Sequence, residues 1–197
     1  MIIGLTGGIG SGKSTFAQFL KHWGAKIFEA DDEAKKYLKH SLVKSEIIRK
    51  FGKEFLDKDK KINSKKLGAF VFQEKSRLRI LENILHPYVI KNIKKTIFFL
   101  KKKKSKGIYV FVIPLLFEKK LEKIFDVVIV LQASEKQRIQ RASHRLKIST
   151  DEVKQRMKHQ LKPNLQTRKA CIVVQNNKSK KELKNKSEQI FKQWIHI

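Results

Sequence analysis

The stretch MIIGLTGGIGSGKST, residues 1–15, decides the fold of this chain. It opens with a short apolar run at residues 1–5, which predicts a buried strand. A loop with almost no side chains follows, built on Gly7, Gly8, Gly10 and Gly12. Apolar residues then recur at the i, i+3, i+4, i+7 spacing of a helix face, at Phe16, Phe19, Leu20 and Trp23. A strand, a glycine-rich loop and a helix in this order are the context that a phosphate-binding loop requires.

The same stretch meets the pattern G-x-x-x-x-G-K-[ST] at Gly7, Gly12, Lys13 and Ser14. Glycines let backbone N–H groups close around phosphate oxygens, and the helix that follows adds the positive end of its dipole. Lys13 should reach the β- and γ-phosphates, and the Ser14 hydroxyl should ligate Mg²⁺. A plain tight turn or a chance match is the alternative, but the strand and the helix around the loop favour binding of a nucleoside triphosphate.

Length and composition indicate one domain with room for an inserted subdomain. The 197 residues are 41% hydrophobic, which is enough for a core. The single cysteine, Cys171, excludes a disulfide within the chain and fits a reducing cytosol. The first apolar run is short and contains Gly4, so we expect no signal peptide, and no later apolar run is long enough to span a bilayer. These features predict a cytoplasmic protein that does not cross a membrane.

The formal net charge of +28 is the most unusual global property. Its lysines are spread along the whole chain, without a nucleic-acid motif or a basic stripe interleaved with aromatic residues. Because lysine, isoleucine, asparagine and phenylalanine are all plentiful, a bias in the composition of the source genome explains the charge equally well. We expect no specific nucleic-acid partner, only weak, salt-sensitive binding to polyanions.

A cluster of carboxylates follows the second predicted strand, residues 25–29. In open α/β sheets, ligands bind at the carboxyl ends of the strands. P-loop enzymes need a carboxylate near the γ-phosphate, which favours a functional role for Asp31. The alternative is that Asp31 caps the helix predicted over residues 33–39, a role that we assign to Asp32.

Residues 41–106 change character and predict a mostly helical insert. Apolar residues follow one another there at helical spacing, and no strand pattern interrupts them. Asn63 is a predicted N-cap, and Pro87 marks a break or a first-turn position. The lysine-rich run at residues 101–106 is typical of a solvated helix end and turn.

Three more strands are predicted at residues 108–113, 127–131 and 171–174, which places Cys171 in the core. Ser134 with Gln137, and Ser149 with Glu152, resemble capping boxes, and a last helix should start at Ser179. Short, β-branched strands separated by helices predict an α/β fold: a five-stranded parallel sheet with helices on both faces. Together with the phosphate-binding loop, this arrangement is expected to form a three-layer sandwich of the P-loop type.

Other P-loop classes fit poorly. A GTPase needs an N-K-x-D motif, but Asn185-Lys186 is followed by Ser187-Glu188. A motor ATPase shows an apolar strand that ends in Asp, whereas the strand at residues 108–113 is followed by Pro114. The helical insert and the arginine-rich helix suggest a small-molecule kinase. The insert would hold the acceptor, and the arginine segment would close as a lid over the phosphates.

Several segments in the right order closely resemble the dephospho-CoA kinase family. The resemblance rests on GLTGGIGSGKST, on Ala30-Asp31 beside the family's D-A-D, on Leu85-His86-Pro87, on Pro114-Leu115-Leu116-Phe117-Glu118, on Gln137, Arg141 and Arg145, and on Gln160 and Asn176. It implies transfer of the ATP γ-phosphoryl group to the ribose 3′-hydroxyl of dephospho-CoA, with Mg²⁺ as the metal. The core would comprise residues 1–40 and 107–197, the insert about 41–106 and the lid about 138–160, all in one domain.

The resemblance also implies roles for individual residues. Asp31 would be the base, Lys13 would bind the phosphates and Arg141 would neutralise charge on the transferred group. The residues expected to bind the nucleotide are Gly8, Gly10, Ser11, Gly12, Lys13, Ser14, Thr15, Arg145 and Asn176. The residues expected at the acceptor are His86, Leu115, Glu118 and Lys65. A structural role remains equally open for His86, and Arg138 is expected on a solvated helix face.

Four positions depart from the family pattern. Glu29 replaces the first Asp of D-A-D, Ser64-Lys65 stands where an Arg is usual, and Cys171 and Gln175 replace acidic residues. A lysine cannot copy a bidentate arginine contact to phosphate. We expect a monomer, with an oligomer as the alternative. The competing functions are another nucleotide or nucleoside kinase, and a basic ATPase that depends on nucleic acid.

Overall fold

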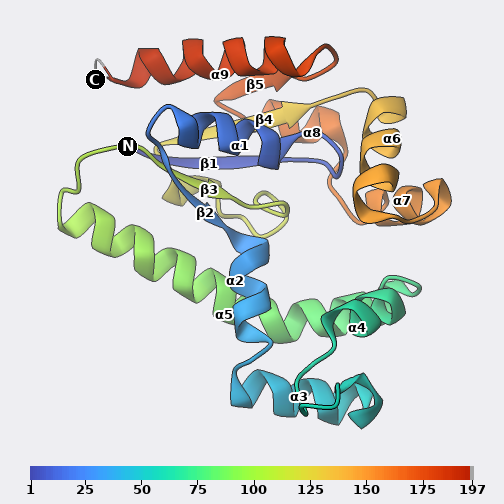
Figure 1. Cartoon of the computed structure of the whole chain (residues 1–197). Coiled ribbons are helices and arrows are strands. Elements are labelled where there is room, and N and C mark those ends of the chain that lie inside the picture. Colours follow the sequence, from blue (N-terminus) through green and yellow to red (C-terminus); the bar gives the residue numbers. More distant parts are fainter. Residues whose placement is uncertain (196–197) are drawn as a thin grey trace. The chain divides into compact units, whose positions relative to one another are not determined.

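The computed structural model describes residues 1–195, and the chain forms two compact units. The first unit contains Met1–Glu29 and the chain from Lys103 onward, and the second contains Ala30–Lys102. Figure 1 traces both units in sequence colours. The second unit begins and ends earlier along the chain than the insert expected at about 41–106, because the first helix after the second strand packs with the helices of the second unit.

The first unit is built on one parallel sheet with the strand order β2-β3-β1-β4-β5. Its strands are β1 (Ile2–Gly7), β2 (Lys26–Glu29), β3 (Tyr109–Val112), β4 (Val127–Gln132) and β5 (Ile172–Gln175). In the register, Ile3 of β1 lies beside Val110 of β3 and Val127 of β4. The predicted five-stranded parallel sheet is confirmed, and the predicted strand ends agree to within about two residues, the usual uncertainty of such limits.

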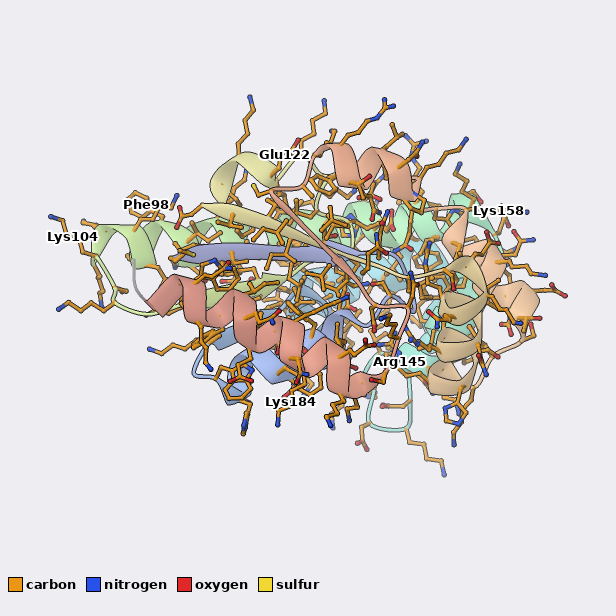
Figure 2. The ribbon with its side chains drawn as sticks, turned by 90° about the horizontal axis from the view of Figure 1, so that it is seen from above. Phe98, Lys104, Glu122, Arg145, Lys158 and Lys184 are labelled. Atoms are coloured by element: carbon orange, nitrogen blue, oxygen red, sulfur yellow. The ribbon has the colours of Figure 1, made fainter. Side chains whose placement is uncertain are left out.

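Helices cover the sheet of the first unit. They are α1 (Lys13–His22), α6 (Glu135–Leu146), α7 (Thr150–Met157), α8 (Pro163–Arg168) and α9 (Lys180–Ile195), with a short 3₁₀ turn η2 (Glu122–Ile124). Helices α1 and α9 pack together, and Figure 2 shows α8 on the opposite side of the strands from α9. Large apolar side chains of β1, α1 and β4 form a buried core, including Ile3, Leu5, Phe16, Leu20, Ile129 and Leu131. Because both faces are covered, the strands lack the alternation of half-exposed strands.

The second unit is entirely helical apart from an isolated bridge between Leu56 and Ile62. Its elements are α2 (Ala30–Tyr37), α3 (Ser41–Phe51), η1 (Lys53–Phe55), α4 (Ser64–Val71) and α5 (Lys75–Lys102). They share a core of their own, and Asn63 is the predicted N-cap of α4, with its Oδ1 accepting from the Lys66 N–H at 3.0 Å. None of the described helices combines the length and the apolar character needed to cross a membrane.

Pro87 does not end a helix, so that prediction was wrong. It lies inside α5, which continues from Lys75 to Lys102. A proline inside a helix removes one hydrogen bond and costs about 3 kcal/mol. The apolar stripe of α5 runs on through this point, with Leu85 and Val89 buried on either side. Burying a large apolar side chain contributes about 1.5–3 kcal/mol, so the packing of the stripe offsets the cost.

Candidate active site

The glycine-rich segment between β1 and α1 forms a tight loop in front of a helix N-terminus. Gly10 and Gly12 have φ values of 73° and 99°, a region that side chains with a Cβ rarely adopt. The Ser11 N–H donates to the Gly8 carbonyl at 3.1 Å, which closes the turn. Helix α1 then begins at Lys13 with no side chain capping its first turn. The predicted strand, loop and helix are therefore all present, with the positive end of the helix dipole directed at the loop.

Lys13 folds back over this loop. Its Nζ donates to the carbonyl oxygens of Gly7 at 2.7 Å and of Gly8 at 3.0 Å. An ammonium group is a compact charge with three donors. Charge-assisted bonds to phosphate are about twice as strong as bonds between neutral groups. The Lys13 ammonium is thus held where bonds to loop carbonyls can be exchanged for bonds to phosphate oxygens.

Arg138 lies against the same loop, which corrects our expectation that it occupies a solvated helix face. Its side chain is buried, and its Nε donates to the Ile9 carbonyl at 3.0 Å. Burial lowers the pKa of the Arg138 guanidinium below its ordinary value, and the nearby Glu135 carboxylate partly opposes this. Helical spacing identifies the faces of α6 but not the distant segment that covers one of them, so the sequence pattern missed this residue.

The main-chain N–H of Ile9 is bound by the segment that follows α7. The Ile9 N–H donates to Oε1 of Gln160 at 2.7 Å. The next residue, Leu161, donates its N–H to Oε1 of Glu118 at 2.7 Å. Oε2 of Glu118 is buried and has no hydrogen-bond partner among residues 1–195. The end of the predicted lid is therefore joined both to the loop and to the segment after β3.

Asn176, which follows β5, shapes the far end of the loop. Its side chain is buried, and its Nδ2 donates to the Ser11 carbonyl at 2.8 Å. A Cβ atom at Gly12 would collide with this amide nitrogen. The main-chain carbonyl of Asn176 in turn accepts a hydrogen bond from Nη1 of Arg141 at 2.9 Å. Asn176 thus links Arg141 to the loop, while the buried Oγ of Ser11 has no hydrogen-bond partner within the described chain.

The N-terminus of α6 is fixed to the loop after β5, and the predicted Ser134–Gln137 capping box is only half formed. Ser134 Oγ accepts from the Gln137 N–H, but the Ser134 N–H donates to Oδ1 of Asn177 at 2.8 Å. The Gln137 side chain also turns to Asn177 and donates to its carbonyl at 2.7 Å. At the other end of α6, Arg145 is exposed (Figure 2). In α7, Ser149 and Glu152 form the predicted capping box.

Asp31 belongs to the second unit, in the first turn of α2. Helix α2 begins at Ala30, directly after β2, so Asp32 lies inside the helix and our prediction of an N-cap there was wrong. Both aspartates are exposed. Asp32 forms an ion pair with Lys35 at 2.9 Å. Carboxylates in the first turn are favoured by the helix dipole, which explains why this sequence starts a helix without a capping residue.

The other predicted site residues divide between the two units. Ser14 and Thr15 are half-buried in the first turn of α1, and Leu115 is half-buried after β3 in the first unit. Lys65 is exposed in the first turn of α4, and His86 is half-buried within α5 in the second unit. Of the predicted nucleotide residues, the structure brings all but the exposed Arg145 together around one loop, while the predicted acceptor residues are divided between the two units.

Comparison with known proteins gives matches over nearly the whole chain. The family model described as "Dephospho-CoA kinase" matches residues 1–182. The chain belongs to the dephospho-CoA kinase family. It is 39% identical over 188 residues to the dephospho-CoA kinase of Fusobacterium nucleatum, covering 95% of each chain. It is 36% identical to that of Carboxydothermus hydrogenoformans, covering 98% of this chain and 94% of the relative.

A solved structure of a dephospho-CoA kinase from Campylobacter jejuni has the same fold. It superposes with a TM-score of 0.67 at 28% identity, covering 98% of this chain and 96% of the other. A shikimate kinase from Acinetobacter baumannii, with a TM-score of 0.57 at 14% identity, shares the fold alone. Membership of this kinase family implies use of ATP and dephospho-CoA, and it confirms the resemblance found in the sequence.

Two of the departures from the family pattern lie at the surface of the first unit. Cys171 is exposed, so our expectation of a core residue was wrong: β5 begins one residue later, at the edge of the sheet. Gln175 is also exposed, and its Nε2 donates to Oε1 of Gln132 at 2.7 Å. A hydrogen-bonded pair of neutral amides therefore stands where the family pattern has an acidic residue. Lys65 is exposed in the second unit.

Proposed function

We propose that this enzyme phosphorylates the ribose 3′-hydroxyl of dephospho-CoA with ATP, giving CoA and ADP, by means of the residues described above. The observation that carries the proposal is the phosphate-binding loop between β1 and α1, placed at the start of a chain that matches one kinase family over residues 1–182. We also infer that the protein acts in the cytoplasm as a monomer.

We infer that the loop residues bind the triphosphate. The Lys13 ammonium would exchange its bonds to Gly7 and Gly8 for oxygens of the β- and γ-phosphates. The loop and the first turn of α1 would supply backbone N–H groups. The nucleotide-binding residues proposed are Gly8, Gly10, Ser11, Gly12, Lys13, Ser14 and Thr15, with Arg145 and Asn176 farther along the chain.

Mg²⁺ would be held mainly by the phosphates and water, with the Ser14 hydroxyl as its ligand from the loop. Among the described residues, no group of three or more His, Cys, Asp or Glu side chains could hold a metal ion alone. This fits a Mg²⁺ ion that arrives with ATP, because Mg²⁺ in kinase sites keeps several waters and binds through substrate phosphates. When bound, the ion would neutralise charge on the β- and γ-phosphates.

Asp31 is our proposed general base. In the reaction, the 3′-oxygen forms a bond to the γ-phosphorus, the bond between that phosphorus and the β–γ bridging oxygen breaks, and Asp31 accepts the proton of the hydroxyl. Only one residue separates Asp31 from Glu29, the last residue of β2, and ligands of such sheets bind at the carboxyl ends of the strands. Exposure of Asp31 suits a base that must meet a substrate.

Arg141 would stabilise the negative charge of the transferred group, with Arg145 as a second arginine of the lid. The Arg141 guanidinium donates a hydrogen bond to the main-chain carbonyl of Asn176, which fixes its orientation. Its other N–H groups would bind phosphate. For the acceptor we propose His86, Leu115, Glu118 and Lys65. Of these, Glu118 stands out because its buried Oε2 has no hydrogen-bond partner among the described residues.

The first experiment is to measure ADP release by the purified enzyme with ATP and Mg²⁺ across a panel of acceptors. The panel holds dephospho-CoA, AMP, CMP, a ribonucleoside and no acceptor, each with and without RNA. We expect ADP only with dephospho-CoA, matched by the appearance of CoA. Turnover with AMP or CMP would indicate a nucleotide kinase instead. Turnover only with RNA, falling steeply with salt, would indicate that the +28 charge serves a nucleic-acid-dependent ATPase.

A further inference from the structure

The main chain of Ile9, in the phosphate-binding loop, is bound by two side chains of the segment predicted as the lid. Its carbonyl accepts from Nε of Arg138 at 3.0 Å, and its N–H donates to Oε1 of Gln160 at 2.7 Å. The two contacts span 129 and 151 residues of sequence, so no local turn requires them. Arg138 and Gln160 are the first and last residues of the segment predicted as the lid. Both ends of that segment therefore hold the main chain of one loop residue, Ile9, through its two adjacent peptide groups.

The loop is shaped to admit Arg138. A Cβ atom at Gly8 would collide with the Arg138 guanidinium, whose Nη2, Cζ and Nε are the nearest atoms. Gly8 does not have a positive φ in the left-handed region, so its backbone conformation would accept alanine. A Cβ atom at Gly10 would meet the main chain of Arg138. The absence of a side chain at Gly8 is thus explained by the arginine above it rather than by its own conformation.

Arg138 also brings a buried positive charge to the side of the phosphate-binding loop. Burying a guanidinium costs free energy unless a negative charge lies nearby. The Glu135 carboxylate favours the charged form of Arg138, but burial outweighs it and lowers the pKa. Its Nε is bonded to a neutral carbonyl, which cancels no charge. A triphosphate in the loop would supply the negative charge that this side chain lacks.

We propose that Arg138 is a positioning residue of the phosphate-binding loop. Arg138 and Gln160 together fix the main chain of Ile9, and we call this pair of hydrogen bonds the clamp. The clamp holds the loop in the shape that receives phosphate, and it makes the loop and the two ends of the lid segment move as one piece. This inference rests on the proposed ATP site. It differs from the roles proposed for Arg141 and Arg145, because Arg138 acts through the loop and contacts no reacting atom.

The first test compares Arg138→Met with Lys136→Met, an exposed residue of the same helix. Binding of ATP and ADP is measured by titration calorimetry without acceptor. Loss of a bond from a charged donor predicts that Arg138→Met weakens ATP binding about tenfold. The KM for dephospho-CoA should not change, Lys136→Met should bind ATP normally, and Arg138→Lys should recover part of the affinity. Unchanged ATP affinity in Arg138→Met would overturn the proposal.

The second test asks whether position 8 must be glycine because of the Arg138 side chain. Gly8→Ala, Arg138→Ala and the double variant form a cycle. We expect Gly8→Ala to weaken ATP binding about tenfold alone but to have no further effect once Arg138→Ala has removed the guanidinium. An equal penalty in both backgrounds would contradict the clamp.

Two further measurements keep the test decisive. If the Arg138 variants do not fold, Gln160→Met removes the acceptor of the Ile9 N–H and leaves the arginine in place. Normal ATP binding by a folded Gln160→Met would overturn the clamp. A wild-type enzyme that binds ATP but does not phosphorylate dephospho-CoA would contradict the proposed function alone, because each binding cycle is measured without acceptor.

Discussion

The phosphate-binding loop and the first turn of α2 carry the two halves of the proposed chemistry, and they are built in different ways. The loop is held by side chains from distant parts of the first unit, namely the buried Arg138 and Asn176 and the half-buried Gln160. The first turn of α2 is exposed, and its Asp32 is paired only with a lysine three residues later within the described contacts. The loop is fixed by tertiary structure, whereas Asp31 and Asp32 are exposed and, in the described part of the chain, only their neighbour Glu33 accepts a hydrogen bond from a distant residue, Nδ2 of Asn92 at 2.8 Å.

This difference separates binding from chemistry. A preformed phosphate site does not need to reorganise during the reaction, which favours electrostatic stabilisation of developing charge. The exposed Asp31 stabilises the fold only through the dipole of α2, by about 0.3–1 kcal/mol, and its proposed chemical role begins when the acceptor hydroxyl is present. Substitutions around the loop should therefore affect both ATP binding and stability, while substitution of Asp31 should affect mainly turnover.

The largest expected effect is that of Asp31→Asn. The amide cannot accept the proton, so kcat should fall by about 10²–10⁴. Affinity for ATP should stay at the wild-type value, and the melting temperature should fall by no more than about 4 °C, because Asp31 is exposed and acts on the fold only through the dipole of α2. Coupled-enzyme assays of ADP release, calorimetry and thermal melts provide the three measurements, and Asp32→Asn is the matched control. Near-normal turnover in Asp31→Asn would show that another group takes the proton.

Lys13→Met should have the next largest effect, and on both binding and turnover. Removing one preorganised charged donor from a transition state costs about 10²–10³ in kcat. The bonds from Lys13 to Gly7 and Gly8 are also lost, so ATP should bind more weakly. Lys21→Met, at an exposed position near the end of the same helix, is the control. Unaltered ATP binding in Lys13→Met would mean that Lys13 stays folded on the loop when nucleotide binds.

Asn176→Ala tests whether the loop depends on distant support. It leaves the buried Ser11 carbonyl without its donor, and an unsatisfied buried polar group costs about 1–3 kcal/mol. We expect urea unfolding to show a loss of that size, together with weaker ATP binding. Asn185→Ala, at an exposed position of α9, should change stability by no more than about 0.5 kcal/mol. Equal stability of the two variants would contradict the view that the loop is held from outside.

The same difference explains what the sequence could predict. The positions of strands and helices and the loop follow from local patterns, as at residues 1–15, where composition and spacing allow few alternatives, whereas the strand order was not predicted. Arg138 and Cys171 were misjudged because their burial depends on segments far away in sequence. A helical residue can face a distant loop, and a residue next to a strand can lie at the sheet edge. Local patterns carry no information about either.

One feature of the sequence, the additional glycine at position 8, is explained only by the structure. The pattern G-x-x-x-x-G-K-[ST] requires Gly7 and Gly12, but it leaves position 8 open. An additional glycine whose φ is not in the left-handed region calls for a close neighbour, and that neighbour is Arg138. Glycines beyond those that a motif requires are therefore useful markers of tertiary contacts around a loop.

The smallest expected effect tests the other side of the comparison. Lys35 pairs with Asp32 at 2.9 Å, and both side chains are exposed. Exposed ion pairs contribute about 0–1 kcal/mol. Lys35→Met should therefore lower the melting temperature by no more than about 4 °C, with kcat and ATP affinity unchanged. A large fall in kcat with a normal melting temperature would show that this local pair orients the first turn of α2 for catalysis. The acceptor side would then be as preorganised as the phosphate loop, through contacts only three residues apart.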